Sequence, residues 1–139
     1  MKSINEQSTT IFLALLERLG YEQYIKITSE GFMPLHFEFI GEVVTNCGVC
    51  NAFSLMHSFL QNGDLMRDPE MCFLHFSDEP GNVFKGVFPY TYQLDAIGVY
   101  QEAVMFHQFG HMDINPGLQE KLSQFANLWL SNIKDQGFI

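Results

Sequence analysis

The chain has 139 residues, of which 47% are hydrophobic and 17% are charged. This length predicts a single domain over residues 1–139, and the apolar content excludes a disordered chain. Seven Lys and Arg against 16 Asp and Glu leave a net charge of −9. That charge argues against direct nucleic-acid binding, because phosphate binding needs clustered cations.

Targeting signals and cysteine usage predict the compartment. The N-terminal segment has no apolar core behind a basic flank and no small-residue cleavage site, so we expect no secretory signal. The longest apolar run, Ile11–Leu16, is far shorter than the ~20 residues of a membrane span. Cys47, Cys50 and Cys72 are odd in number, and a domain of this size does not need disulfides. We therefore expect a reducing bacterial cytoplasm and no membrane contact.

An amphipathic helix is predicted near the N-terminus, over about residues 4–19. Ser3 followed by Glu6 fits a capping box, in which each side chain satisfies a backbone donor of the other residue. Gly20 supplies a helix stop. One apolar face follows from a spacing of i, i+3, i+4 and i+7 in Phe12, Leu15, Leu16 and Leu19.

The middle of the chain predicts an antiparallel sheet of about five strands. Alternation of apolar and polar residues indicates a strand with one wet face at Leu35–Phe39. In the predicted strand Val83–Tyr92, Gly86 and Pro89 indicate a bulge or a position at the edge of the sheet. The segment before this strand, Glu79–Asn82, has the composition of a turn. The remaining predicted strands are Ala52–Leu60, Met71–Phe76, Val83–Tyr92 and Val99–Phe106.

A second amphipathic helix is predicted at about residues 116–134. Asn115 can cap it, and Pro116 suits the first helical position, where a missing N–H costs nothing. Its apolar face comprises Leu118, Leu122, Phe125, Trp129 and Ile133. The order of helix, strands and helix predicts an α+β fold with the two helices packed on a meander-like sheet.

The most polar segment, Gln61–Glu70, follows His57 and is expected to form a loop between two strands. Asn62-Gly63 supplies positive φ angles for a tight turn, and Asp68-Pro69 is a favourable turn start. One interpretation is a structural hairpin loop. The alternative is a site for metal-assisted hydrolysis or acid–base chemistry that uses the candidate catalytic residues His57, Asp64, Asp68 and Glu70.

A zinc site is a weaker hypothesis. Cys47 and Cys50 form a CxxC, and His107 and His111 stand four residues apart, so the four could complete a tetrahedral site. The His spacing requires a helix, however, and Gly110 makes one unfavourable there. We expect loop thiols, no metal and no cofactor.

A nucleophilic triad is not expected from the sequence. Ser54 and Ser58 flank His57 on the opposite face of one predicted strand, where they cannot share a hydrogen bond with it. Tyr90, Tyr92 and Tyr100 are the aromatic residues expected to line an exposed sheet face or groove.

Several segments resemble an uncharacterised bacterial family. They are Phe32–Leu35, Gln61–Met71, Gly98–Glu102 and the pattern Trp129…Asn132…Gln136-Gly137-Phe138. The family is a domain of unknown function that is often encoded on plasmids and integrative elements. The similarity runs from about residue 10 to the C-terminus. The resemblance implies a small cytoplasmic accessory protein of a mobile element and no particular chemistry.

The predicted function is that of a non-enzymatic binding protein. The expected partner is another protein or a second copy of the chain, docked on an aromatic sheet face or an exposed edge strand. A lesser alternative is an acidic mimic of DNA that inhibits a DNA-binding enzyme. The predicted contact residues are Asn62, Asp64, Arg67, Asp68, Tyr92, Tyr100 and Glu102.

Overall fold

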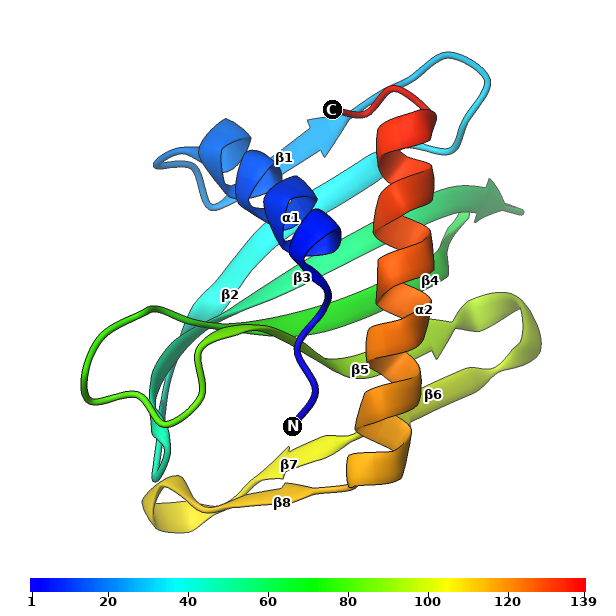
Figure 1. The fold of residues 1–139 in the computed structure, drawn as a ribbon. Helices are drawn as coiled ribbons and strands as arrows, with labels where there is room; N and C mark the ends of the chain where they lie inside the picture. The colour runs from blue at the N-terminus through cyan, green and yellow to red at the C-terminus, as the bar shows by residue number, and fades with distance from the viewer.

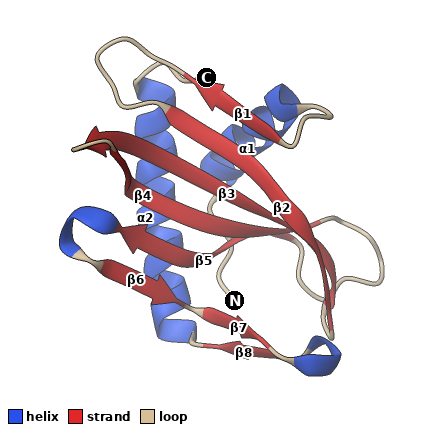
Figure 2. Cartoon of the chain, turned by 180° about the vertical axis from the view of Figure 1, so that it is seen from behind, coloured by secondary structure: helices blue, strands red, loops and turns tan.

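A computed structural model describes residues 1–139 as two helices and two antiparallel sheets. Six strands form the main sheet in the sequential order β1-β2-β3-β4-β5-β6, and β7 pairs with β8. Both helices pack on one face of the main sheet, and the opposite face, here called the open face, carries no helix (Figures 1 and 2). This confirms the α+β prediction. The elements are α1 Glu6–Leu19, β1 Tyr24–Ile27, β2 Leu35–Thr45, β3 Gly48–Gln61, β4 Asp64–Phe76, β5 Gly86–Leu94, β6 Val99–Glu102, β7 Val104–Phe106, β8 Met112–Ile114 and α2 Pro116–Asp135.

Helix α1 begins after Asn5, whose side-chain carbonyl accepts a hydrogen bond from the Ser8 N–H at 2.8 Å. The predicted capping box was therefore wrong. Ser3 lies in the segment before the helix, where its backbone carbonyl accepts a hydrogen bond from Ser123 Oγ of α2 at 2.8 Å. Gly20 ends the helix, as predicted.

Helix α2 has the predicted start, because the Asn115 side chain accepts a hydrogen bond from the Leu118 N–H at 3.1 Å. The buried Gln119 fixes this helix to two other segments. Its Nε2 donates to the carbonyls of Lys2, at 2.8 Å, and of Pro89 in β5, at 3.2 Å. The N-terminal segment is thus held between α2 and the sheet. Neither α1 nor α2 combines the length and the apolar character that a membrane-spanning helix needs.

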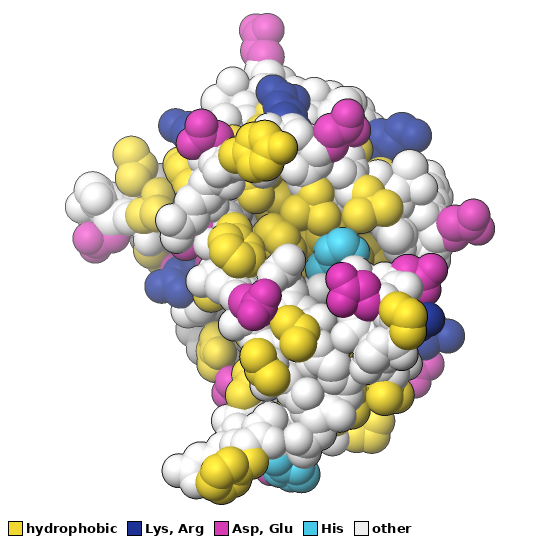
Figure 3. Space-filling view, turned by 90° about the vertical axis from the view of Figure 1, so that its left-hand side faces the viewer, with side chains coloured by type: hydrophobic (Ala, Val, Ile, Leu, Met, Phe, Trp, Pro, Cys, Tyr) yellow, Lys and Arg dark blue, Asp and Glu magenta, His cyan; other side chains and the backbone are white.

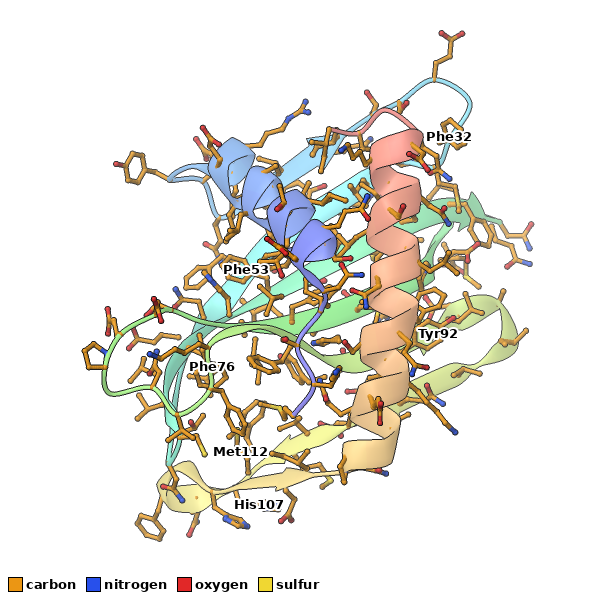
Figure 4. The ribbon with its side chains drawn as sticks, viewed as in Figure 1. Phe32, Phe53, Phe76, Tyr92, His107 and Met112 are labelled. Carbon is orange, nitrogen blue, oxygen red and sulfur yellow. The ribbon has the colours of Figure 1, made fainter.

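The main core lies between the helices and the sheet, with Phe12 of α1 at its centre. Its ring centroid lies 5.5 Å from that of Phe37, 5.8 Å from Phe53 and 5.3 Å from Phe73. These three rings come from β2, β3 and β4, and Figure 4 shows Phe53 under α1. One helical side chain therefore holds three neighbouring strands to α1 through aromatic packing.

The sheet differs from the prediction in its number of strands. The short β1 and β8 were not predicted, because neither is long enough to show an alternating pattern. The predicted strand Val99–Phe106 is divided into β6 and β7 at Ala103, whose N–H donates to the Tyr90 carbonyl at 2.8 Å. Tyr90 is the extra residue of a bulge between β4 and β5, and this confirms the bulge expected near Pro89.

The predicted loop at residues 61–70 was wrong. Only Asn62 and Gly63 form the turn, with φ angles of 52° and 85°, and β4 begins at Asp64. Asp68-Pro69 does not start a turn but forms a bulge inside β4, opposite the single residue His57. Because proline has no N–H to give to a strand partner, it fits this interruption of the hydrogen-bond ladder.

A second apolar cluster lies toward the other end of the sheet and contains Cys50, Ala52, Leu74, Phe76 and Phe88. The interpretation of Cys50 as a loop thiol was wrong, since it is a buried residue of β3. Cys47 does lie in the turn between β2 and β3. The hairpin of β7 and β8 reaches that same turn, where the Asn46 N–H donates to the Gly110 carbonyl at 2.8 Å.

Replacing Phe12 by Ala removes the ring that joins α1 to three strands. We expect Phe12→Ala to lower the free energy of unfolding by about 3–5 kcal/mol, measured by urea denaturation. Leu13→Ala is the control, because Leu13 is its neighbour on the helix and is 44% exposed. Equal losses in the two variants would contradict the central role of Phe12.

The cap assignment is tested by a second pair of variants. Asn5→Ala removes the acceptor for the Ser8 N–H and is expected to cost about 1 kcal/mol in urea denaturation. Ser3→Ala should change stability by less than about 0.5 kcal/mol, because only the backbone of Ser3 is used. A larger loss of stability in Ser3→Ala than in Asn5→Ala would instead support the predicted capping box.

Candidate functional site

The bulge in β4 decides which polar side chains reach each face of the sheet. Arg67 pairs with Ser58, and Glu70 pairs with Met56, so Asp68 and Pro69 together lie opposite His57. In a regular strand, side chains alternate between the two faces. The extra residue breaks this alternation. Arg67 and Glu70 consequently share the open face, and Asp68 is directed to the helix side with His57.

A pocket of about 220 Å³ lies where β3 and β4 meet the end of α2. Figure 4 shows Phe32, from the loop between β1 and β2, beside this end of the helix. We call it the His57 pocket. Its eight lining residues are Phe32, Met33, His57, Asp68, Pro69, Trp129, Asn132 and Gln136.

His57 is 6% exposed and is held in one orientation by the backbone. Its Nδ1 lies 3.2 Å from the Met33 carbonyl and 3.3 Å from the Pro34 carbonyl. Because carbonyls only accept, Nδ1 carries the proton, and Nε2 keeps its lone pair as an acceptor. Burial lowers the pKa of His57, an effect that these carbonyls and Asp68 partly oppose.

Trp129 supplies the second polar group of the pocket wall. It is 6% exposed, and its indole N–H is the one buried side-chain polar atom of the structure without a hydrogen-bond partner. Its ring centroid lies 5.7 Å from that of His57. Leaving a buried donor unpaired costs about 1–3 kcal/mol, so such groups are rare in native proteins.

Asn132 lies on the same side of α2 as Trp129, because it follows it by three residues, and Gln136 is the residue that caps the end of the helix. The C-terminal end of a helix carries a partial negative charge that favours donors and cations. The residues that line the pocket therefore carry one buried donor, the Trp129 indole N–H, and acceptor groups in the His57 imidazole and the Asp68 carboxylate. The two amides can serve as either.

Of the four candidate catalytic residues, only His57 and Asp68 line a common pocket. Asp64 is exposed beside the hairpin turn, and Glu70 accepts a hydrogen bond from Ser54 Oγ at 2.7 Å on the other face. No group of three or more His, Cys, Asp or Glu side chains is arranged to hold a metal ion.

Arg67 belongs to a polar network on the open face rather than to the pocket. Its Nε lies 3.2 Å from the Asp95 carboxylate, its Nη1 lies 3.6 Å from the Glu70 carboxylate, and Nη1 donates to Gln93 Oε1 at 2.8 Å. Sequence reasoning missed Asp95 and Gln93, because nothing local to β5 shows that Arg67 reaches them. The network fixes β4 to the end of β5.

The predicted contact residues are divided between the two faces. Tyr100 and Glu102 lie on the edge strand β6, and Tyr100 is 57% exposed. Tyr92, in contrast, pairs with the buried Met71 and packs on Phe125 of α2, with ring centroids 5.3 Å apart. The expectation that Tyr92 lines the exposed sheet face was therefore wrong. Asn62 is exposed at the hairpin turn.

The two pairs of the zinc hypothesis do not form one site. Burial raises the pKa of the Cys50 thiol to about 11. His107 (Figure 4) and His111 both lie on the β7–β8 hairpin. Their Nε2 atoms are 2.7 Å and 3.1 Å from the Asp113 carboxylate. These hydrogen bonds lower the pKa of Asp113.

The buried state of His57 predicts a pH dependence of stability. Native His57 stays neutral below pH 6.5, where the unfolded chain takes up a proton. The unfolded state then binds more protons, so the free energy of unfolding falls as the pH falls through 6.5. We expect His57→Gln to weaken this dependence in denaturation measured between about pH 7 and pH 5. An unaltered slope in His57→Gln would contradict the assignment.

Comparison with known proteins identifies a family and no activity. No curated protein and no solved structure matches the chain. The family is described as Domain of unknown function (DUF6908), in agreement with the resemblance to an uncharacterised family. Its model matches residues 9–139, and the chain therefore belongs to this family.

Proposed function

We propose that this protein is a binding protein whose His57 pocket holds its ligand without transforming it. The observation that carries the proposal is the unpaired, buried N–H of Trp129, a residue that lines the pocket. A ligand that supplies an acceptor would recover the free energy lost by leaving this donor unpaired. Recovery of that loss makes ligand binding more favourable than it would be at a site that is already satisfied.

The groups around the pocket define the chemistry of the ligand. It needs an acceptor for the Trp129 N–H and donors for His57 Nε2 and the Asp68 carboxylate. A primary carboxamide has both, on two atoms that are bonded to the same carbon. The volume of about 220 Å³ is below the ~300–1,000 Å³ of pockets for drug-sized ligands, which favours a small group. Phe32 and Pro69 supply apolar walls for the rest of the ligand.

The carboxamide can come from a free molecule or from an Asn or Gln side chain of a partner protein. Apolar residues near the turn of the β3–β4 hairpin favour a protein partner. Leu60 and Leu65 lie there, 73% and 54% exposed, next to Asn62 and Asp64. Such a surface can widen the contact around a single inserted side chain. The resemblance implies an accessory protein of a mobile element, and we include that role in the proposal.

Acid–base chemistry is the second candidate function of the His57 pocket. It is favoured by the fixed orientation of His57, whose Nε2 can take up a proton from a bound molecule beside Asp68. This reading requires turnover, which simple binding does not. It involves only these two of the four predicted catalytic residues.

Mimicry of DNA ranks below both candidates. A mimic needs carboxylates in a dense array near phosphate spacing, whereas the net charge of −9 is spread along the chain. On the face drawn in Figure 3, Asp and Glu side chains are distributed between Lys, Arg and hydrophobic groups. This distribution gives less support to mimicry than the unpaired indole gives to ligand binding.

The proposal predicts that the pocket binds small carboxamides. Saturation-transfer NMR with acetamide, propionamide and nicotinamide should show binding to the native protein. Trp129→Phe keeps an aromatic ring, although a smaller one, and removes the N–H, and the loss of about 1 kcal/mol should weaken binding about fivefold. Asp68→Asn should also weaken it. Asp64→Asn is the matched control, because Asp64 lies outside the pocket, and it should bind normally.

The source of the carboxamide is decided by a second measurement. Capture of host proteins by the native protein but not by Trp129→Phe would indicate a partner side chain. Light scattering on the purified protein would show whether that partner is a second copy. Absence of both amide binding and Trp129-dependent capture would refute the proposed function, and conversion of a bound amide would favour the acid–base alternative.

A further inference from the structure

The largest cavity of the structure lies away from the His57 pocket, where β1, β2 and the β3–β4 hairpin meet. It has a volume of about 360 Å³, and we call it the Ser58 cavity. His36 alternates along β2 with the buried Leu35 and Phe37, so its side chain belongs to the open face of the sheet. The lining residues are Lys26, Pro34, His36, Ser58, Phe59, Leu60 and Leu65.

Three polar side chains form a row across β1, β2 and β3 at this cavity. Ser58 Oγ lies 2.8 Å from His36 Nε2, and the opposite ring nitrogen, Nδ1, is hydrogen-bonded to the Tyr24 hydroxyl. The Tyr24 ring also stacks on the imidazole at a centroid distance of 5.8 Å and an angle of 23°. Hydrogen bonds thus connect a hydroxyl to a base and the base to a group that orients it. This is the arrangement that activates a serine as a nucleophile.

His36 is suited to take up a proton. Burial, the Lys26 ammonium and His57 all lower its pKa, so the imidazole is neutral at pH 7. When Nδ1–H donates to the Tyr24 oxygen, Nε2 is left to accept the hydroxyl proton of Ser58. Ser58 itself is only 2% exposed, and it is reached through the cavity that it lines.

We propose that Ser58 is a nucleophile that attacks carboxylic esters bearing a small apolar acyl group. The Ser58 oxygen forms a bond to the ester carbonyl carbon, and its proton passes to His36 Nε2. The bond from that carbon to the alcohol oxygen then breaks, and the alcohol leaves with the proton from His36. Water next attacks the acyl-serine with His36 as base, which releases the carboxylic acid and restores Ser58.

The other cavity residues fit this step. Lys26 supplies a positive charge that can stabilise the oxyanion formed on the carbonyl oxygen. Phe59, Leu60 and Leu65 offer apolar surface to the acyl chain. No residue lines both this cavity and the His57 pocket. Leu60 and Leu65 also belong to the surface proposed above for a protein partner, but labelling of Ser58 is measured without a partner, so this test does not depend on the proposed binding function.

The first test uses an alkyl fluorophosphonate, which phosphonylates activated serines with loss of fluoride. Mass spectrometry of the digested native protein should place the label on Ser58. Ser58→Ala and His36→Gln should lose at least about nine-tenths of the labelling rate. Ser54→Ala is the matched control, because Ser54 lies on the same strand but is bonded to the Glu70 carboxylate, and it should label normally.

The second test is hydrolysis of p-nitrophenyl butyrate. We expect hydrolysis that depends on Ser58, with Tyr24→Phe lowering kcat while KM stays unchanged, since Tyr24 positions the base without touching the ester. Circular dichroism establishes that each variant is folded. Absence of label on Ser58 in the native protein would overturn the proposal. Equal hydrolysis by native protein and folded Ser58→Ala would do the same.

Discussion

The bulge at Asp68 and Pro69 is the constraint on which the arrangement of polar groups depends. A strand without it would place Asp68 on the same face as Glu70, because residues two apart point the same way. The bulge instead gives Asp68 to the helix side, where it is the charged neighbour of His57. It leaves Arg67 and Glu70 together on the open face. One added residue thus places the ion pairs of Arg67 on one face of the sheet and the Asp68 carboxylate, in the His57 pocket, on the other.

Helix α2 serves the core and the pocket with different parts of one surface. Leu130 and Ile133 are fully buried in the core, and Trp129 and Asn132 border the pocket. The indole N–H therefore lies in a rigid element that cannot easily rotate it toward water. The unpaired indole N–H lowers the stability of the fold. Binding sites that are formed before the ligand arrives commonly reduce the stability of the protein in this way.

Local chemistry made much of the fold predictable. Asn115 and Gly20 mark helix ends through interactions within a few residues, and the apolar face containing Phe12 follows from helical spacing. The polar composition of residues 64–70 predicts a loop, whereas Arg67 of this strand is paired with Gln93 and Asp95, which no local pattern in the sequence reveals. The partnership of Ser58 and His36 joins residues 22 apart on neighbouring strands, so only the strand register reveals it.

The chain closes on itself through the segment before α1. Ile4 donates its N–H to Val87 of β5, Ser3 accepts from Ser123, and the Asn5 N–H donates to Asn127 Oδ1. The N-terminal residues leave the ribosome first. Their backbone groups can form these hydrogen bonds only after their partners, which follow more than 80 residues later, have been translated. Until α2 emerges, the nascent sheet exposes the apolar face that this helix covers, and molecular chaperones bind surfaces of that kind. Packing of α2 therefore buries this face and supplies the last partners of the N-terminal segment.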